Sequence, residues 1–554
     1  MDSRRKPLRT PDSNPCSSLI SSTRRMVSSL PSIRSAQPYG SSAVYVKGTF
    51  LKGLGDILCD PSGKGMGTLI FDTLAPAISE KENSNGCAVF TLGPPVLGVT
   101  GMLVTSSEAI KSVMKTNQDN INNHDGAGNL GKFLGKNTIF LMKTDDQKWK
   151  NARTRHAPFF SDKKQLNLNI PQIYKIINEK MQAIDQTGTI PDLEKFSAHF
   201  TMEVMAKINL GMTVFPDETK DTLHKIMNDV ACELGNQTGT FQKAMVPFLN
   251  YFPLNHIFAA DTVDRYFNPK LHKLIDEGDH FLREKILLPN EESIRTTKKN
   301  WIVGDDKIIP DAMKDFLLSK EARDRAVHAL TAGTETTTHL IFHGVATLGL
   351  PESKEIVKKL REEIASIKNG DISQWELKDF EEARYLNAFI DELLRLYPPV
   401  PVMLAIGKSK YDTPFKIEDM TLKGGEYIFL SPAVTHRLKS IWGKDADVFR
   451  PERFFEEKCP KKNPFAYFPF GWQPRVCVGK DFAKLEAMMI FINFINQYDL
   501  KLQETLKHPL PYNVIFTAQT ALKGLKMTCE KRTLCSEVTL KLTEEREKSS
   551  SMRL

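Results

Sequence analysis

The stretch FPFGWQPRVCVGKDFAKLEA, from Phe468 to Ala487, contains one thiol, Cys477, immediately before a segment with helical periodicity. Apolar residues such as Phe482 and Leu485 recur on one face, which predicts a helix that begins just after Gly479. Backbone N–H groups and the helix dipole stabilise negative charge at a helix N-terminus, so a thiolate is favoured at Cys477. An isolated cysteine is more often a buried structural residue, and the rest of the chain decides between the two interpretations.

The glycines on either side of the thiol, Gly471 and Gly479, let the backbone pass close to a flat and bulky group. A thiolate at one axial position of a haem iron donates electron density to the metal and favours cleavage of the O–O bond. The stretch therefore suits a haem-thiolate site in which Cys477 is the axial ligand, and the motifs elsewhere in the chain decide between this site and a structural cysteine.

Other motifs precede the thiol in the chain. They are a W-x-x-x-R pair at Trp149 and Arg153, TAGTETTT at 331–338, DELLRLYPPVP at 391–401, HRLKSIWGKDADVF at 436–449 and FRPERF at 449–454. Glu392 and Arg395 are spaced i, i+3, so their side chains can pair on one helical face, and prolines 398, 399 and 401 end that helix. Each motif alone is weak evidence; their order along the chain is strong evidence.

Together these motifs resemble the cytochrome P-450 family, in its eukaryotic form, over about residues 60–530. The resemblance implies a mainly α fold with a small β-sheet subdomain (α+β), in which a triangular helical prism encloses haem b, and a proximal Cys477 thiolate. One departure is Gln473, where the family usually has glycine. If Gln473 adopts the backbone conformation of that glycine, we expect a local cost on the order of 1 kcal/mol.

The resemblance also implies roles for individual residues. Arg475, Arg153 and Trp149 bind the haem propionates, because a guanidinium matches a carboxylate bidentately. Glu392, Arg395 and Arg453 form a buried charge cluster that fixes the loop carrying the cysteine.

On the other side of the haem, the resemblance implies that Glu335 and Thr336 deliver protons during oxygen activation and that Gly333 lets the long helix open beside them. The alternative for Thr336 is a hydroxyl bonded back to its own helix. Positions expected to line the substrate pocket are Ala329, Gly333, Val402, Met403, Leu404 and the turn near Thr520 and Ala521.

The predicted function is a haem-thiolate monooxygenase that inserts one oxygen atom from O2 into a hydrophobic small molecule, such as a terpenoid, fatty acid, sterol or polyketide of secondary metabolism. Two alternatives stay open. One is a hydroperoxide isomerase or dehydratase of the same fold, which needs no reductase. The other is a non-catalytic haem-binding sensor, which the substitution at Gln473 motivates.

Electrons are expected from a separate partner, because the remaining sequence leaves no room for a flavin or nicotinamide domain. Lys480 and Lys484 are i, i+4 on the helix after the cysteine, and Lys458, Lys461 and Lys462 precede it. A basic face of this kind suits an acidic NADPH-dependent flavoprotein reductase or a ferredoxin. A merely solvated lysine face is the alternative.

The chain has 554 residues and a net charge of +8, and residues 1–50 carry eight basic and two acidic side chains, a net +6. This leader is rich in serine and arginine, as organelle presequences are, although a disordered basic tail is an equal alternative. The eight cysteines are scattered without a C-x-x-C pair, which suits a reducing compartment. We therefore expect an intracellular protein, either organellar, cytoplasmic or at the periphery of a membrane. No aromatic interleaving accompanies the basic charge, so nucleic-acid binding is not expected.

No membrane-spanning helix is expected from the sequence. The longest stretch without charge, 83–107, contains Pro94 and Pro95 and alternating β-branched residues, which predicts two strands of a hairpin. Peripheral contact with a membrane through apolar loops stays open.

We predict three parts: a leader at 1–55, a catalytic domain at 56–530 and a charged tail at 531–554. Within the domain, a serine-capped helix is expected at 106–115, a long loop at 117–136, helices at 312–350 and 353–396, a polar connector at 287–308, strands at 402–430 and a C-terminal hairpin around TALKG.

Overall fold

Helices dominate the structure, which is a computed structural model. It describes residues 44–45, 87–92, 99–117, 121–122, 138–140, 142, 144, 146–213, 215–238, 269–290, 320–405, 408–409, 415–418, 420–422, 427–514, 518–520 and 522–532. Nearly all of the expected leader, most of the loop at 117–136, most of the connector at 287–308, Ala521 and nearly all of the charged tail lie outside the described residues.

The longer α-helices of the described chain come in the order α7 (Gln147–Ser161), α8 (Lys163–Thr187), α9 (Leu193–Val204), α10 (Asp217–Thr238), α13 (Pro269–Phe281), α16 (Lys320–Leu348), α17 (Lys354–Ser366), α19 (Arg384–Leu396) and α22 (Lys480–Gln497). Short α-helices are α5 (Ser107–Lys111), α18 (Leu377–Glu382), α20 (Pro432–Thr435) and α21 (Lys439–Trp442). π-Helical turns continue α5, α9 and α13 at Ser112–Thr116, Met205–Asn209 and Leu282–Leu287.

The largest sheet has the strand order β1–β2–β3–β10–β6 and combines strands from the first hundred or so residues with strands between residues 403 and 430. Its strands are β1 (Val44–Tyr45), β2 (Cys87–Leu92), β3 (Val99–Val104), β10 (Tyr427–Leu430) and β6 (Met403–Ala405). The smaller sheets are β11–β14–β5, from Tyr498–Leu502, Met527–Lys531 and Thr189–Ile190; β12–β13, from Tyr512–Val514 and Ala518–Thr520; β4–β7, from Ile121–Asn122 and Lys408–Ser409; and β8–β9, from Phe415–Ile417 and Met420–Leu422.

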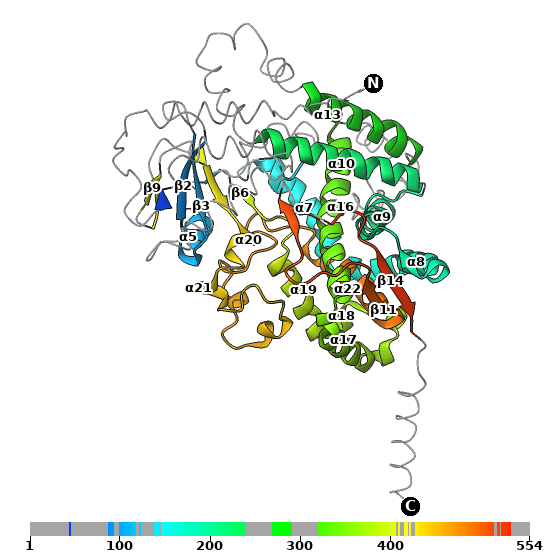
Figure 1. The fold of residues 1–554 in the computed structure, drawn as a ribbon. Helices are drawn as coiled ribbons and strands as arrows, with labels where there is room; N and C mark the ends of the chain where they lie inside the picture. The colour runs from blue at the N-terminus through cyan, green and yellow to red at the C-terminus, as the bar shows by residue number, and fades with distance from the viewer. Residues whose placement is uncertain are drawn as a thin grey trace, which may run out of the picture.

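Figure 1 shows the large sheet on one side of the molecule, together with the short helices α5, α20 and α21, and most of the longer helices on the other, with α16 running through the middle. Two glycines of α16 permit its close packing. A Cβ built on Gly344 would lie 2.1 Å from Cζ of Phe491 on α22, and one built on Gly333 would lie 2.5 Å from Cε of Met205. A Cβ at either distance requires the neighbouring side chain to shift, and the fully buried ring of Phe491 can do so less easily than the flexible end of Met205.

Several expectations from the sequence are confirmed. The Oγ of Ser106 accepts from the backbone N–H of Ala109 at 3.2 Å and caps α5, because a hydroxyl satisfies one of the free donors of the first turn. The stretch at 83–107 forms the antiparallel pair β2–β3, and strands β6 to β10 lie between residues 402 and 430. The mainly α architecture with small sheets is the one that the sequence predicts.

The C-terminal hairpin is partly wrong. Strand β12 pairs with β13, and the chain after TALKG forms β14, which pairs with β11 and β5 instead of with β13. The reason is that Met527 and Cys529 on β14 are buried against the helical core, and they reach it only from this second sheet.

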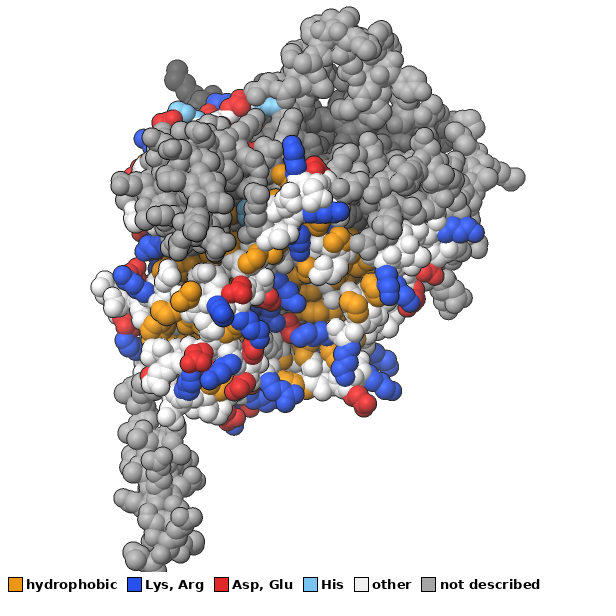
Figure 2. Space-filling view, turned by 180° about the vertical axis from the view of Figure 1, so that it is seen from behind, with side chains coloured by type: hydrophobic (Ala, Val, Ile, Leu, Met, Phe, Trp, Pro, Cys, Tyr) orange, Lys and Arg blue, Asp and Glu red, His pale blue; other side chains and the backbone are white. Residues whose placement is uncertain are grey.

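Across the described ranges, none of the helices combines the length and the apolarity needed to cross a bilayer. On the rear face of the molecule, Figure 2 shows basic side chains distributed between apolar and acidic ones. Neither sign of charge forms a continuous patch on this face (Figure 2), so a charged partner would be attracted by particular side chains and not by the face as a whole.

Candidate functional site

The loop that carries Cys477 folds back on itself. The backbone N–H of Cys477 donates to the carbonyl of Phe470 at 2.8 Å, and that of Gly471 donates to the carbonyl of Phe468 at 3.0 Å. Gly471 has φ of 74°, in the left-handed region that glycine adopts at little cost. Gln473 is not among the described residues with positive φ, so the strain expected there is not present and the special conformation falls on Gly471.

The thiol of Cys477 is exposed, whereas the thiols of Cys87, Cys459 and Cys529 are buried. Burial nevertheless raises the pKa of the Cys477 thiol, opposed by hydrogen bonds from the backbone N–H groups of Gly479 and Lys480 and by the charge of Arg153. An accessible sulfur that is also strongly desolvated faces an enclosed space inside the protein and not the outer surface. Helix α22 begins at Lys480, so the sulfur sits at the N-terminus of that helix, as the sequence predicts.

Three further predicted residues lie together beside this loop. The guanidinium carbon of Arg475 is 4.4 Å from the ring centroid of Trp149, and that of Arg153 is 5.6 Å from the same ring. Nη2 of Arg153 donates to the carbonyl of Val476 at 2.6 Å, so α7 is fastened directly to the residue before the thiol. The structure therefore brings both guanidinium groups and the indole to one side of Cys477.

A short segment between 138 and 144 borders the same group. Nη1 of Arg475 and Nε1 of Trp149 both donate to the carbonyl of Ile139, at 2.8 and 3.0 Å. Nε of Arg475 donates to the hydroxyl of Thr144 at 2.8 Å, and its Nη2 donates to the carbonyl of Met142. This segment was not expected at the site, and Phe140 within it is 39% exposed. No sequence signal marks it, because its contacts are made mainly through backbone carbonyls.

Glu392, Arg395 and Arg453 form a fully buried cluster. Nε of Arg395 is 2.6 Å from Oε2 of Glu392, and Nε of Arg453 is 3.0 Å from Oε1 of the same carboxylate. Burying three charges is tolerated here because each guanidinium also donates to backbone carbonyls. Arg395 binds the carbonyls of His436 and Ala446, at 2.8 and 2.6 Å.

This cluster connects to the loop of the thiol through His436. The backbone N–H of Phe468 donates to Nε2 of His436 at 3.0 Å, and the carbonyl of His436 accepts from Arg395. Because Nε2 accepts, the proton of the neutral ring is on Nδ1. Burial, and then the charge of Arg395, lower the pKa of His436 to about 3.

Asp391, next to Glu392 in sequence, holds two of the lysines that were expected on the basic face. Its carboxylate pairs with Nζ of Lys461 and, at 3.2 Å, with Nζ of Lys484. Tyr467 also donates to Asp391, at 3.3 Å. These two lysines therefore connect the α19 helix to α22 and to the chain before the thiol, while Lys458 and Lys480 are exposed.

The middle of α16 has one accessible face. His328, Ala332, Glu335 and Thr336 are spaced i, i+4, i+7 and i+8, so they share one side of the helix, and each is partly or fully exposed. Residues on the opposite side are buried: Val327, Leu330, Thr334, Thr337 and Thr338. We refer to His328, Ala332, Glu335 and Thr336 as the open face of α16. From Thr337 to Leu350 every residue is buried.

The expected opening of this helix at Gly333 is not observed, and this prediction is wrong. Helix α16 continues without a break from Lys320 to Leu348, and Oγ1 of Thr336 donates to the carbonyl of Ala332 at 2.8 Å. The position of a Cβ on Gly333 points at Met205, so the glycine serves the packing of α16 against the turn after α9.

The other predicted pocket residues are placed as follows. Sδ of Met403 lies 3.9 Å from the Cβ position of Gly471, so Met403 is next to the cysteine loop. Val402 is half-buried beside it, and Leu404 pairs with Phe429 in the large sheet. Ala329 is half-buried on α16, and β13, which contains Thr520, contacts α16.

His328 is a site residue that the sequence interpretation missed. Its ring centroid is 6.1 Å from that of Phe140, in the segment that binds Arg475. The signal was available, because His328 lies two helical turns before Thr336 on the same face.

The site as a whole matches the chemistry needed to hold a haem and its carboxylates. It has an enclosed thiol at a helix N-terminus, a loop whose turn is made at Gly471, and two guanidinium groups beside an indole.

Comparison with known proteins gives a consistent result. Residues 96–525 match the family model described as Cytochrome P450. Cytochrome P450 52A1 of Candida tropicalis is 25% identical over 443 residues, which cover 76% of this chain and 76% of that protein. Cytochrome P450 72A13 of Arabidopsis thaliana is 24% identical over 442 residues, or 78% of this chain and 80% of that protein. Cytochrome P450 monooxygenase fsdH of Fusarium heterosporum is 24% identical over 460 residues, or 78% and 74%.

Proposed function

The chain belongs to the cytochrome P450 family, and from this premise we propose that it oxidises a hydrophobic small molecule with electrons from a separate reductase. As a member of the family it is an oxidoreductase, a haem-thiolate monooxygenase that binds haem b through a cysteine thiolate. When bound, the haem activates O2 so that one oxygen atom enters a C–H bond and the other leaves as water, which consumes two electrons and two protons. The domain that performs this reaction is assigned to residues 56–530.

Cys477 is the residue that we assign as the thiolate ligand. The observation that carries this assignment is that its sulfur is exposed to an enclosed space while backbone N–H groups of Gly479 and Lys480 point at it. Such donors stabilise a sulfur anion and orient it. The other described cysteines are buried, so none of them offers a sulfur to a ligand.

Arg475, Arg153 and Trp149 are assigned to the haem propionates. The two guanidinium groups flank one indole ring on the side of the site where α7 meets the cysteine loop. Each guanidinium has several N–H donors, so Arg475 can exchange a carbonyl partner for a carboxylate, which forms the stronger, charge-assisted hydrogen bond.

Glu392, Arg395 and Arg453 are assigned to hold the cysteine loop in place. The support is the continuous path from the buried carboxylate through Arg395 and His436 to the backbone of Phe468, nine residues before the thiol. These residues position the ligand without contacting the substrate.

Glu335 and Thr336 are assigned to proton delivery. Both lie on the open face of α16, and both are accessible where the opposite side of the helix is buried. The Thr336 hydroxyl donates to Ala332, so its oxygen lone pairs remain able to accept a hydrogen bond from a water or an acid and to hold that proton donor at the open face.

The substrate is proposed to be an apolar organic molecule, such as a terpenoid, fatty acid, sterol or polyketide. The support is the apolar or small character of Ala329, Ala332, Val402, Met403 and Leu404 around the site. A site lined in this way stabilises ligands by burial of apolar surface, with few polar groups to orient them.

The electron donor is proposed to be an acidic flavoprotein reductase or a ferredoxin that binds the basic face near the thiol. Lys461 and Lys484 are engaged by Asp391, so the charge offered to a partner comes mainly from Lys458, Lys462 and Lys480, which are exposed. Because these lysines attract an acidic partner electrostatically, we predict that the affinity between the chain and its electron donor decreases as the salt concentration rises.

The test is a reduced carbon-monoxide difference spectrum of the purified, haem-loaded chain, followed by turnover with NADPH and a reductase. A thiolate-type spectrum and oxygenated product that depends on NADPH support the proposal. A spectrum of imidazole ligation, or product formed only from an organic hydroperoxide without a reductase, contradicts it.

A further inference from the structure

His328 occupies a position on the open face of α16 that the reaction assigned above does not use. Its ring lies beside the Phe140 ring, at a centroid distance of 6.1 Å and an interplanar angle of 30°. No described residue hydrogen-bonds to either nitrogen of the His328 ring. A histidine in such a place is a polar group that protein contacts leave available to a ligand.

Two separate paths of contacts connect His328 to the loop that carries the thiol. Arg475, two residues before Cys477, donates to the carbonyl of Ile139, and the next residue, Phe140, faces His328. On α7, Arg153 donates to the carbonyl of Val476, and His156, one turn further along, lies close enough for its charge to act on His328. Both paths connect the cysteine loop to His328 within a few side chains.

The surroundings of the ring define its chemical state. His328 is only half-buried by exposed area, yet burial, and then the charge of His156, lower its pKa to about 4. As with Cys477, this combination describes a group that faces an enclosed space. At neutral pH the ring is uncharged and offers one N–H donor and one nitrogen acceptor, which match a hydroxyl group.

We propose that His328 is a specificity-determining residue, whose imidazole hydrogen-bonds to a hydroxyl group of an elongated apolar substrate. This inference rests on the proposed function. His328 and Thr336 are eight residues apart on one helix, so the anchored hydroxyl and the oxidised carbon are separated by about 12 Å along the axis. A hydroxyl is favoured over a carboxylate, because Glu335 on the same face repels an anion.

The experiment measures ligand binding to the full, haem-loaded chain. Linear primary alcohols of eight to sixteen carbons and the matching alkanes are titrated, and dissociation constants are obtained from the change in haem absorbance. We expect the parent protein to bind the best alcohol about tenfold more tightly than its alkane, the effect of one hydrogen bond in an apolar site.

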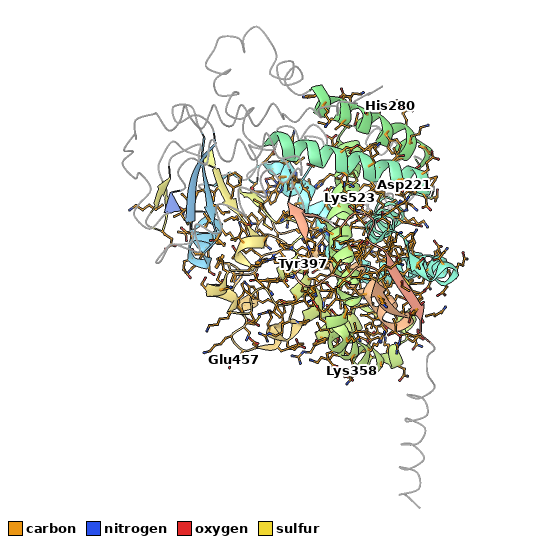
Figure 3. The ribbon with its side chains drawn as sticks, in the orientation of Figure 1. Asp221, His280, Lys358, Tyr397, Glu457 and Lys523 are labelled. Atoms are coloured by element: carbon orange, nitrogen blue, oxygen red, sulfur yellow. The ribbon has the colours of Figure 1, made fainter. Side chains whose placement is uncertain are left out.

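Replacement of His328 is expected to remove this preference. His328→Phe should bind alcohol and alkane equally, and His328→Gln, which keeps a donor and an acceptor, should retain part of the preference. His280→Phe is the matched control, because His280 is an exposed histidine on α13, at the periphery of the molecule (Figure 3), and this change should leave all constants unaltered.

Three results would overturn the inference. The parent binds no alcohol of the series more tightly than its alkane; His328→Phe keeps the full preference; or His328→Phe and His328→Gln both stay folded but lose haem, which would assign His328 to the cofactor. In the first two results the carbon-monoxide spectrum of the parent stays intact, so the proposed function stands. A parent chain that retains no haem contradicts both.

Discussion

The backbone N–H of Phe468 donates a hydrogen bond of 3.0 Å to Nε2 of His436, and the carbonyl of His436 accepts one of 2.8 Å from Arg395. One histidine thus joins the start of the cysteine loop to the buried charge cluster. The hydrogen bond from Phe468 requires an unprotonated Nε2. The connection between the cysteine loop and the charge cluster therefore exists only while the ring of His436 is neutral.

The first prediction concerns pH. The pKa of His436 is about 3 in the folded chain and near 6.5 in the unfolded chain, so between these values the unfolded state binds more protons. Stability is therefore full above pH 6.5 and falls as the pH decreases, by at most about 1.4 kcal/mol per pH unit for this group. His343 and His508, whose pKa values burial lowers to about 3 and 4, add to the same slope.

Urea unfolding at several pH values between 7 and 4 checks this expectation. His436→Gln preserves an acceptor near Nε2 without a titratable ring, so its stability should decrease less steeply than that of the parent. Equal slopes for the parent and His436→Gln would show that the histidine does not supply the linkage.

The second prediction concerns the charge cluster. Glu392→Gln leaves the guanidinium groups of Arg395 and Arg453 buried beside a neutral amide, and we expect a loss of about 3–5 kcal/mol in the free energy of unfolding. Glu381→Gln is the matched control, because its ion pair with Lys163 is 2.7 Å long but exposed and should cost less than about 1 kcal/mol. Denaturant unfolding of both variants checks this, and similar small losses would contradict the burial argument.

The third prediction concerns the thiol. Cys477→Ala should abolish retention of haem, because no other described cysteine offers an exposed sulfur. Cys459→Ala removes a buried thiol before the loop and should retain haem in full. The measurement is the ratio of haem absorbance to protein after gel filtration. A Cys477→Ala protein with a full complement of haem and an unchanged spectrum would remove the basis of the ligand assignment.

The fourth prediction concerns proton delivery. Thr336→Ala should keep haem but lower the yield of product per O2 consumed, since the accessible hydroxyl on α16 is lost, and Thr336→Ser should restore the yield. The matched control is Thr222→Ala on α10, which removes the same type of hydroxyl bond, to the carbonyl of Glu218 at 2.9 Å, from another helix. If Thr336→Ala keeps the parental yield, the hydroxyl serves only its own helix.

The fifth prediction compares two glycines of α16. In Gly344→Ala the new Cβ meets the fully buried ring of Phe491, whereas in Gly333→Ala it meets the flexible end of Met205. Overpacking costs about 1–3 kcal/mol, and alanine in a helix returns up to about 1 kcal/mol, so Gly344→Ala should be clearly destabilising and Gly333→Ala much less so. Thermal unfolding checks this, and Phe491→Leu combined with Gly344→Ala should recover part of the loss.

The sequence was informative where function depends on neighbouring residues. The i, i+3 spacing of Glu392 and Arg395, the cysteine before α22 and the serine cap of α5 all follow from local geometry, and the structure has each pair in contact or in place. The roles of the site residues stay predictions.

Features that depend on contacts between distant segments were not predictable. Gly333 was expected to open its helix, but Met205, more than a hundred residues away, decides its role. Phe140 reaches His328 across a similar separation, and Asp391 withdraws Lys461 and Lys484 from the surface charge. Strand β14 likewise selects β11 as its partner because of the core beneath it.

The abrupt change in accessibility along α16, between Thr336 and Thr337, has a consequence for protein engineering and for natural divergence. Mutational libraries directed at His328 and Ala332 on the open face should yield folded catalysts with altered selectivity. The same libraries one turn further along should instead yield misfolded chains. A single helix therefore contains a region that can evolve new chemistry beside one that must stay fixed.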